Sequence, residues 1–145
     1  MDAFENTVTI ARPRDEVFAF LADFRNVPRW NYAIDETWQT SPGPTGVGAT
    51  YSQTRSIPLK SQEAFEVTVF EPPARVAIHG KIGPFLATLT YLLAPAVGGT
   101  RLTNRVDLEP SQAVARLAAP IAVPRVRTAV AANLVALKQI LEDES

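Results

Sequence analysis

A few polar side chains stand at strand positions that otherwise carry apolar residues, and these are the residues most able to do chemistry. Tyr51, Gln53 and Arg55 alternate along one stretch of chain, so they share one face of a strand. Tyr91 shares its parity with flanking leucines, and Asn104 shares its parity with Leu102 and Val106. A phenol or an amide in an apolar wall orients a ligand by hydrogen bonding, and the same groups also fit an internal hydrogen-bond network. For Arg55 a further alternative is a strand end outside the cavity, with the guanidinium reaching water.

The two tryptophans are candidates for the boundary of a binding site. Trp30 ends a short helical turn, where it serves either as an entrance aromatic or as a plug between helix and sheet. Trp38 shares parity with Ile34, which predicts that it faces inward. We therefore take Trp30, Trp38, Tyr51, Gln53, Arg55, Tyr91 and Asn104 as the candidate ligand-binding residues.

The sequence disfavours other kinds of site. The chain has one histidine and no cysteine, and His79 falls on the parity opposite Val76 and Ile78, so we expect it to face solvent. The adjacent carboxylates Asp35 and Glu36 point to opposite faces of a strand and are poor partners for acid–base work. No glycine-rich phosphate loop stands between a strand and a helix. We expect no metal and no cofactor, and the sequence assigns no catalytic residue.

Size and charge narrow the class of protein. The 145 residues, 46% hydrophobic and 20% charged, suit a single domain, residues 1–145, without disulfides. A formal charge of -1 with interspersed signs gives no footprint for nucleic acid. The N-terminus does not resemble a signal peptide, and charged residues and prolines interrupt the most apolar stretch, 113–136, so we expect a cytoplasmic protein without stable membrane insertion.

Elements that could position the candidate residues follow from the hydrophobic periodicity. Residues 4–10 alternate as a strand, and Pro13 begins an amphipathic helix that runs to about Asp23, followed by a short turn through Trp30. Period-two patterns then predict six strands, at 34–40, 48–57, 61–71, 75–82, 85–94 and 101–109.

The C-terminal part switches to helical periodicity. Val126, Val130, Leu134, Leu137 and Leu141 mark one face of a long helix, and the pair of prolines at 120 and 124 is expected to separate it from the 111–119 segment. The twelve prolines otherwise fall at element ends. The order predicts an α+β domain in which an antiparallel sheet of about seven strands curls around the final helix and leaves a cavity between them.

Several local sequences support this arrangement by resemblance. Four segments occur in an order that resembles the helix-grip superfamily called SRPBCC. They are Ala11-Arg12-Pro13-Arg14-Asp15-Glu16-Val17-Phe18, the segment 23–30 ending in Pro28-Arg29-Trp30, the segment 70–76 with Pro72-Pro73, and the Gly98-Gly99-Thr100 turn. This superfamily includes START-type lipid-transfer domains and the polyketide cyclase/dehydrase group. The resemblance implies a helix-grip fold with one or two short helices after the first strand, and it implies no single activity.

Three functions are compatible with these observations. The leading hypothesis is binding of one small hydrophobic or aromatic molecule, such as a lipid, polyketide or steroid-like compound, in the cavity. A polyketide cyclase or dehydratase without metal or covalent nucleophile is the alternative, and a partner-binding module like the superfamily's chaperone activators is the third. Either a monomer or a homodimer is compatible with the sequence.

Overall fold

The computed structural model describes residues 2–82, 85–110 and 113–143. Its elements are β1 (Asp2–Ile10), α1 (Arg14–Leu21), the 3-10 turn η1 (Phe24–Asn26), α2 (Val27–Trp30), β2 (Ile34–Gln39), β3 (Thr50–Arg55), β4 (Ser61–Glu71), β5 (Arg75–Ile82), β6 (Phe85–Ala96), β7 (Gly99–Pro110) and α3 (Ala113–Asp143). The seven expected strands are all present, with ends shifted by no more than two residues.

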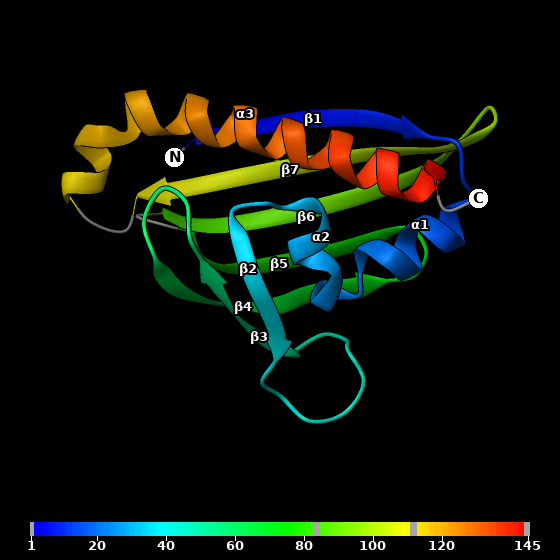
Figure 1. Cartoon of the computed structure of the whole chain (residues 1–145), viewed down its shortest axis with the longest axis horizontal. Helices are drawn as coiled ribbons and strands as arrows, with labels where there is room; N and C mark the ends of the chain where they lie inside the picture. The colour runs from blue at the N-terminus through cyan, green and yellow to red at the C-terminus, as the bar shows by residue number, and fades with distance from the viewer. Residues whose placement is uncertain (1, 83–84, 111–112, 144–145) are drawn as a thin grey trace.

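The strands form one antiparallel sheet in the order β1-β7-β6-β5-β4-β3-β2. After the first strand the chain meanders from β2 to β7, and β7 then pairs with β1, so the first and last strands are neighbours at one edge of the sheet. The sheet curls, and the helices lie on one of its faces with α3 running across it (Figure 1). The expected α+β helix-grip architecture is confirmed.

The short helices follow from local chemistry. Pro13 precedes the first residue of α1 with extended backbone, and Asp15 and Glu16 occupy the first turn, where the helix dipole favours anions. Val17, Phe18 and Leu21 form the buried face of α1. The Asp23 side chain accepts a hydrogen bond from the Arg25 backbone N–H and caps η1, which leads directly into α2.

The long C-terminal helix differs from the expectation at its prolines. Pro120 and Pro124 lie inside α3, which runs without a break from Ala113 to Asp143, so the predicted separation is wrong. Each proline lacks the N–H that would bond the carbonyl four residues earlier, and this bends a helix more readily than it ends one when tertiary contacts hold both halves. Figure 1 shows the first turns of α3 inclined to the rest.

Two apolar clusters form the core. The larger packs Ile10, Val17, Leu21, Leu137 and Leu141 at the C-terminal half of α3. The smaller is built on Phe4, Phe85, Val106 and Leu108 under the N-terminal half of the same helix. Within the part of the chain that the structure describes, no helix is long and apolar enough to cross a membrane.

Candidate functional site

A cavity of about 580 Å³ lies between the sheet and α3, and side chains from both apolar clusters line it. Its volume falls in the range of pockets that hold small molecules. Strand alternation provides the floor, with Phe65, Ile78, Ala87 and Leu89 pointing inward from neighbouring strands.

The roof of the cavity is the middle and N-terminal half of α3. Its inward stripe has small and β-branched residues, among them Ala118, Ala122, Val126, Ala129 and Val130. Short side chains leave space that leucine or phenylalanine at these positions would occupy. Because these α3 side chains are short and the sheet curls, a cavity remains between helix and sheet here.

One glycine contributes to the floor. A Cβ at Gly80 would lie 2.3 Å from the Ala64 carbonyl oxygen and 2.8 Å from the Cα and Cβ of Phe65, which is opposite it in the β4–β5 register. Position 80 therefore has no room for a side chain beside the backbone of β4.

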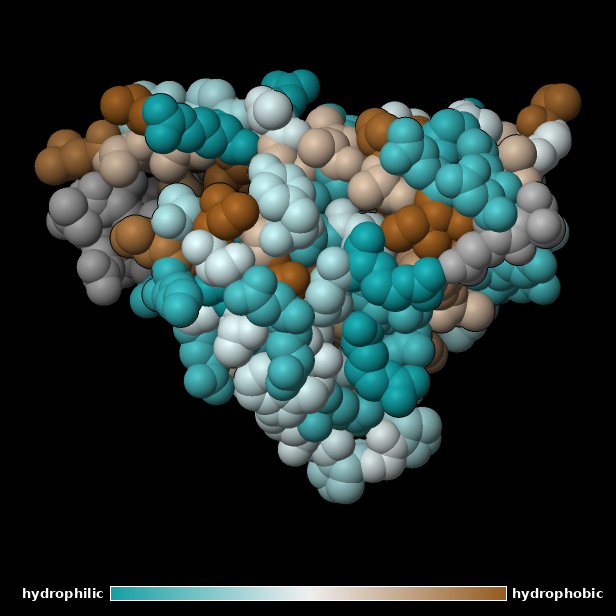
Figure 2. Space-filling model, viewed as in Figure 1, coloured by the Kyte–Doolittle hydropathy of each residue, from teal (hydrophilic) through white to brown (hydrophobic). Residues whose placement is uncertain are grey.

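The cavity opens to solvent beside the N-terminal half of α3. Tyr32, Ile57, Ile121 and Arg125 line it and are also exposed. Figure 2 shows hydrophobic side chains gathered at the end of α3 that lies on the left in this view. The opening lies between residues 31–33, the loop after β3, the end of β5 and α3. We call this opening the mouth.

Tyr91 contributes a buried polar group to the cavity wall. It is 4% exposed, and its hydroxyl forms no hydrogen bond with another described residue. Burial raises the pKa of the Tyr91 phenol well above its usual range, because the phenolate would be poorly solvated. Tyr91 therefore stays neutral and able to donate a hydrogen bond.

Asn104 lies beside Tyr91 on β7 and is fully buried. Its Nδ2 donates to the Thr90 carbonyl oxygen over 3.2 Å, while its Oδ1 has no partner among the described residues. Asn6, directly opposite on β1, has a buried and unpaired Nδ2. A donor and an acceptor on facing residues need only a small adjustment to pair, so this geometry favours an internal network for Asn104.

Gln53 and Arg55 lie near the mouth and meet a residue that the sequence analysis missed. Glu63 on β4 is 7% exposed and accepts from Arg55 Nε over 2.8 Å, from Arg55 Nη2 over 3.1 Å and from Gln53 Nε2 over 3.0 Å. Arg55 thus neither reaches out to water nor stays unpaired. The alternation of Glu63 with Phe65 and Val67 could have revealed its inward side chain.

Trp30 borders the cavity from the end of α2. Its side chain is 6% exposed, and its Nε1–H has no partner among the described residues. Asn133 on α3 also lines the cavity, is 9% exposed and forms no hydrogen bond with a described residue. It follows Val130 at helical spacing, which is the signal that sequence reasoning overlooked.

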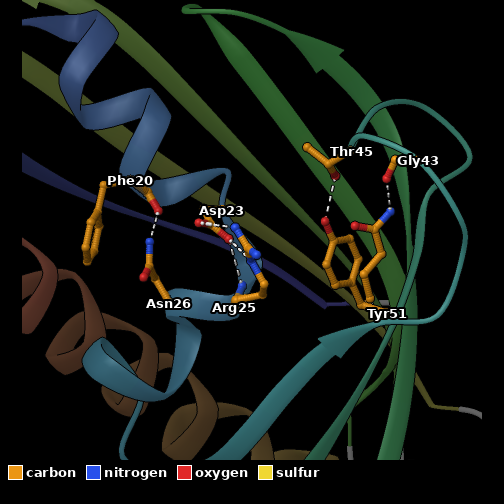
Figure 3. A network of polar contacts seen from close by, with 8 residues as sticks. Phe20, Asp23, Arg25, Asn26, Gly43, Thr45 and Tyr51 are labelled. Atoms are coloured by element: carbon orange, nitrogen blue, oxygen red, sulfur yellow. Dashed lines mark hydrogen bonds and ion pairs between the residues drawn. The ribbon is translucent and has the colours of Figure 1, made fainter.

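Two candidates lie elsewhere. Tyr51 is buried but does not line the cavity: its ring stacks on Phe65 with centroids 5.3 Å apart, and its hydroxyl donates to Thr45 Oγ1 over 2.7 Å (Figure 3). The prediction of an inward Trp38 is wrong. A register shift between Ile34 and Glu36 reverses the parity of β2. Thr37, which pairs with Gln53, is therefore the buried residue, and the Trp38 side chain lies on the outer face of the sheet.

The structure therefore brings five candidates to the cavity, namely Trp30, Gln53, Arg55, Tyr91 and Asn104. Their role as ligand contacts stays a prediction. The described residues that line the cavity include no carboxylate and no histidine. His79 is exposed on the outer face, where its Nδ1 lies 3.0 Å from Thr88 Oγ1.

Comparisons with known proteins agree with this arrangement. Residues 1–142 match the model of the family "Polyketide cyclase / dehydrase and lipid transport". The chain is 32% identical over 106 residues, 69% of its length, to the uncharacterized protein Rv2574 of Mycobacterium tuberculosis, and it spans 61% of the length of that relative.

Solved structures share the fold at low sequence identity. A START superfamily protein from Mycobacterium smegmatis superposes with a TM-score of 0.83 at 16% identity, covering 99% of both chains. The di-domain ARO/CYC protein StfQ of the steffimycin biosynthetic pathway gives a TM-score of 0.79 at 15% identity, covering 98% of this chain and 51% of StfQ.

Proposed function

Since this chain belongs to the polyketide cyclase / dehydrase and lipid transport family, we propose that it binds one small, mainly apolar molecule between the sheet and α3. The observation that carries this proposal is the cavity of about 580 Å³, which is lined mainly by apolar side chains and reaches the surface at the mouth. A protein with no guest to hold would gain stability by filling such a space with larger side chains.

Burial of the guest supplies most of the binding free energy. Each 100 Å² of apolar surface removed from water contributes roughly 2.5 kcal/mol before the entropy of association is subtracted. The few polar groups of the wall then orient the ligand, because a hydrogen bond to Tyr91, Asn133 or Gln53 forms in only one pose.

A fluorescent displacement assay with a matched pair of variants tests this proposal. N-phenyl-1-naphthylamine is a neutral apolar probe that brightens on leaving water, and we expect the wild-type chain to bind it. Ala87→Phe places a ring on the cavity floor, where Ala87 is 1% exposed, and should abolish binding. Leu86→Phe adds a ring on the outer face of the same strand and should leave binding intact.

The outcomes separate clearly. Equal probe binding by both variants would place the probe outside the cavity and contradict the proposal. Native mass spectrometry of protein purified from its own host should in addition reveal a co-purified small molecule that Ala87→Phe lacks.

A cyclase or dehydratase is the second candidate, and one observation favours it: Tyr91 presents a neutral, unpaired phenol to the cavity. Such a group could donate a hydrogen bond to an enolate oxygen while the apolar walls fold a poly-β-ketone. The lack of a carboxylate or imidazole among the described lining residues makes binding without turnover the better-supported function. Cyclisation of a poly-β-ketone that is lost in Tyr91→Phe would favour the enzyme.

A further inference from the structure

The polar groups that the strands contribute to the cavity wall are concentrated in two places. Gln53 lies two residues beyond Tyr51 on β3, in the direction of the mouth. Tyr91 lies four residues beyond Ala87 on β6, in the direction away from the mouth. Tyr51 and Ala87 belong to one row across the sheet, because Tyr51 pairs with Phe65, Phe65 with Gly80 and Gly80 with Ala87. The two polar places are therefore separated by about 20 Å of strand length.

Apolar side chains occupy the wall between them. Ile78, Leu89 and Val106 lie in one row of paired strand positions and line the cavity. An occupant that contacts both polar places is thus elongated and apolar in its middle, with a hydrogen-bonding group at each end.

The place near the mouth contains a cation whose charge is already compensated. The Arg55 guanidinium donates twice to the Glu63 carboxylate, and the Arg55 and Glu63 side chains are only 14% and 5% exposed. Gln53 lines the cavity and commits its Nε2 to the same carboxylate, which leaves its Oε1, an acceptor without a partner among the described residues, for a ligand. A ligand carboxylate here would add a second anion to a buried site in which the Arg55 cation is already paired.

Other cations near the cavity are in a different environment. Lys81 and Arg125 line it at the mouth, where both are exposed. Water and salt screen charges at such positions, so an ion pair formed there adds little affinity. The buried part of the wall therefore offers a neutral phenol, the indole N–H of Trp30, amide groups and an internally paired charge.

We propose that the cavity selects an uncharged amphipathic molecule with a hydroxyl group at its mouth end over the carboxylate of the same carbon skeleton, and that Glu63 determines this specificity. This inference rests on the proposed function, because it assumes that the cavity binds a ligand. Glu63 acts by compensating Arg55 and by turning the acceptor oxygen of Gln53 toward the guest.

Competition between two probes of equal chain length tests the proposal. Dodecan-1-ol and dodecanoate displace N-phenyl-1-naphthylamine at about pH 8, where the carboxylic acid is ionised. The wild-type chain should bind the alcohol at least roughly tenfold more tightly, since the buried carboxylate would lack a free cation. Glu63→Gln removes the compensating charge and should reverse the order, because Arg55 then pairs with the ligand carboxylate.

Glu66→Gln is the matched control. Glu66 lies on the same strand with its side chain exposed, so this variant changes the net charge by the same amount without touching the cavity. It should keep the wild-type preference for the alcohol. A preference for dodecanoate in the wild-type chain, or an unchanged order in folded Glu63→Gln, would overturn the proposal.

A variant that keeps the ion pair covers the case in which Glu63→Gln does not fold. Gln53→Met removes the acceptor but leaves both Arg55–Glu63 hydrogen bonds in place, and it should weaken the alcohol selectively. Equal affinities of wild type and Gln53→Met for the alcohol would also count against the assignment. Failure of the wild-type chain to bind even the naphthylamine probe would instead refute the proposed function.

Discussion

The two halves of α3 face the same sheet and perform different tasks. In the C-terminal half Leu134, Leu137 and Leu141 are buried in the larger apolar cluster. In the N-terminal half Leu117 is 83% exposed and Ile121 is 67% exposed, and the inward stripe of this half covers the cavity.

Polar contacts strengthen this difference. The C-terminal half is fastened to the start of the chain: Arg12 Nε donates to the Leu141 carbonyl oxygen, the Ala11 N–H donates to Glu142, and Lys138 donates to the Thr9 carbonyl oxygen. The described part of the N-terminal half forms no hydrogen bond with the sheet and contacts it through the Arg127 guanidinium over the Phe4 ring, and its two prolines remove hydrogen bonds within the helix. One helix thus combines a fixed end that holds the fold and a less constrained end over the cavity.

The largest expected effect is the difference in the free energy of unfolding between truncations in the two halves. Leu137→Ala should lower the free energy of unfolding by about 2–5 kcal/mol, because it opens a void in dense packing. Val126→Ala should cost about 1 kcal/mol or less, because Val126 is half-buried and already borders empty space. Urea unfolding measures both, and equal losses would show that the two halves pack alike.

Binding of a probe in the cavity should reduce the difference in local stability between the two halves of α3. At a free concentration of 100 times its dissociation constant, N-phenyl-1-naphthylamine should stabilise the folded chain by about 2.7 kcal/mol. Hydrogen exchange should slow more in residues 116–130, which include most of the α3 positions that line the cavity, than in residues 137–141. Uniform slowing along α3 would mean that the ligand acts on global stability alone.

Much of this architecture could be predicted from the sequence because burial on one face fixes strand parity. The strands 61–71 and 75–82 match β4 and β5 at both ends, and Tyr91 and Asn104 lie on the inward face as their apolar neighbours require. The site was harder to predict, because parity gives the face of a residue and not its place along the cavity. Tyr51 is inward yet lies among Phe24, Phe65 and Thr45, outside the hollow.

The remaining errors have specific physical causes. Trp38 was misplaced by one irregular pairing in β2, which the alternation of a short strand does not reveal. The prolines of α3 were interpreted as breaks because tertiary contacts that hold a bent helix together are not visible locally. Glu63 was missed because a charged residue at an inward position is the exception to the hydrophobic pattern.

Restoring the backbone hydrogen bonds in the less constrained half should have a smaller effect. Pro120→Ala supplies the N–H that can bond the carbonyl of residue 116 and should stabilise the chain by about 1 kcal/mol, less than the ~3 kcal/mol intrinsic difference because the bend is already accommodated. Hydrogen exchange in residues 116–124 should slow, and so should probe release measured by stopped flow. Faster release would show that the bend itself holds the mouth closed.

The smallest effect concerns the pH dependence of the tie at the fixed end. Two hydrogen bonds lower the pKa of Glu142. The one from Lys138 has the larger effect, and the one from the Ala11 N–H has the smaller. A carboxyl whose folded pKa lies below its unfolded value of about 4.3 stabilises the fold above that pH and loses this contribution as the pH falls through the folded pKa. Urea midpoints of Glu142→Gln should therefore lie below those of wild type near neutrality and converge with them in acid.

Glu66→Gln again serves as the control for the Glu142 measurement, because Glu66 is exposed and forms no ion pair with a described residue. Its urea midpoints should follow those of wild type across the pH range. If Glu142→Gln behaves in the same way, the hydrogen bonds between Glu142 and the start of the chain do not help to fix this end of α3. The packing of Leu134, Leu137 and Leu141 would then account by itself for the contrast between the two halves.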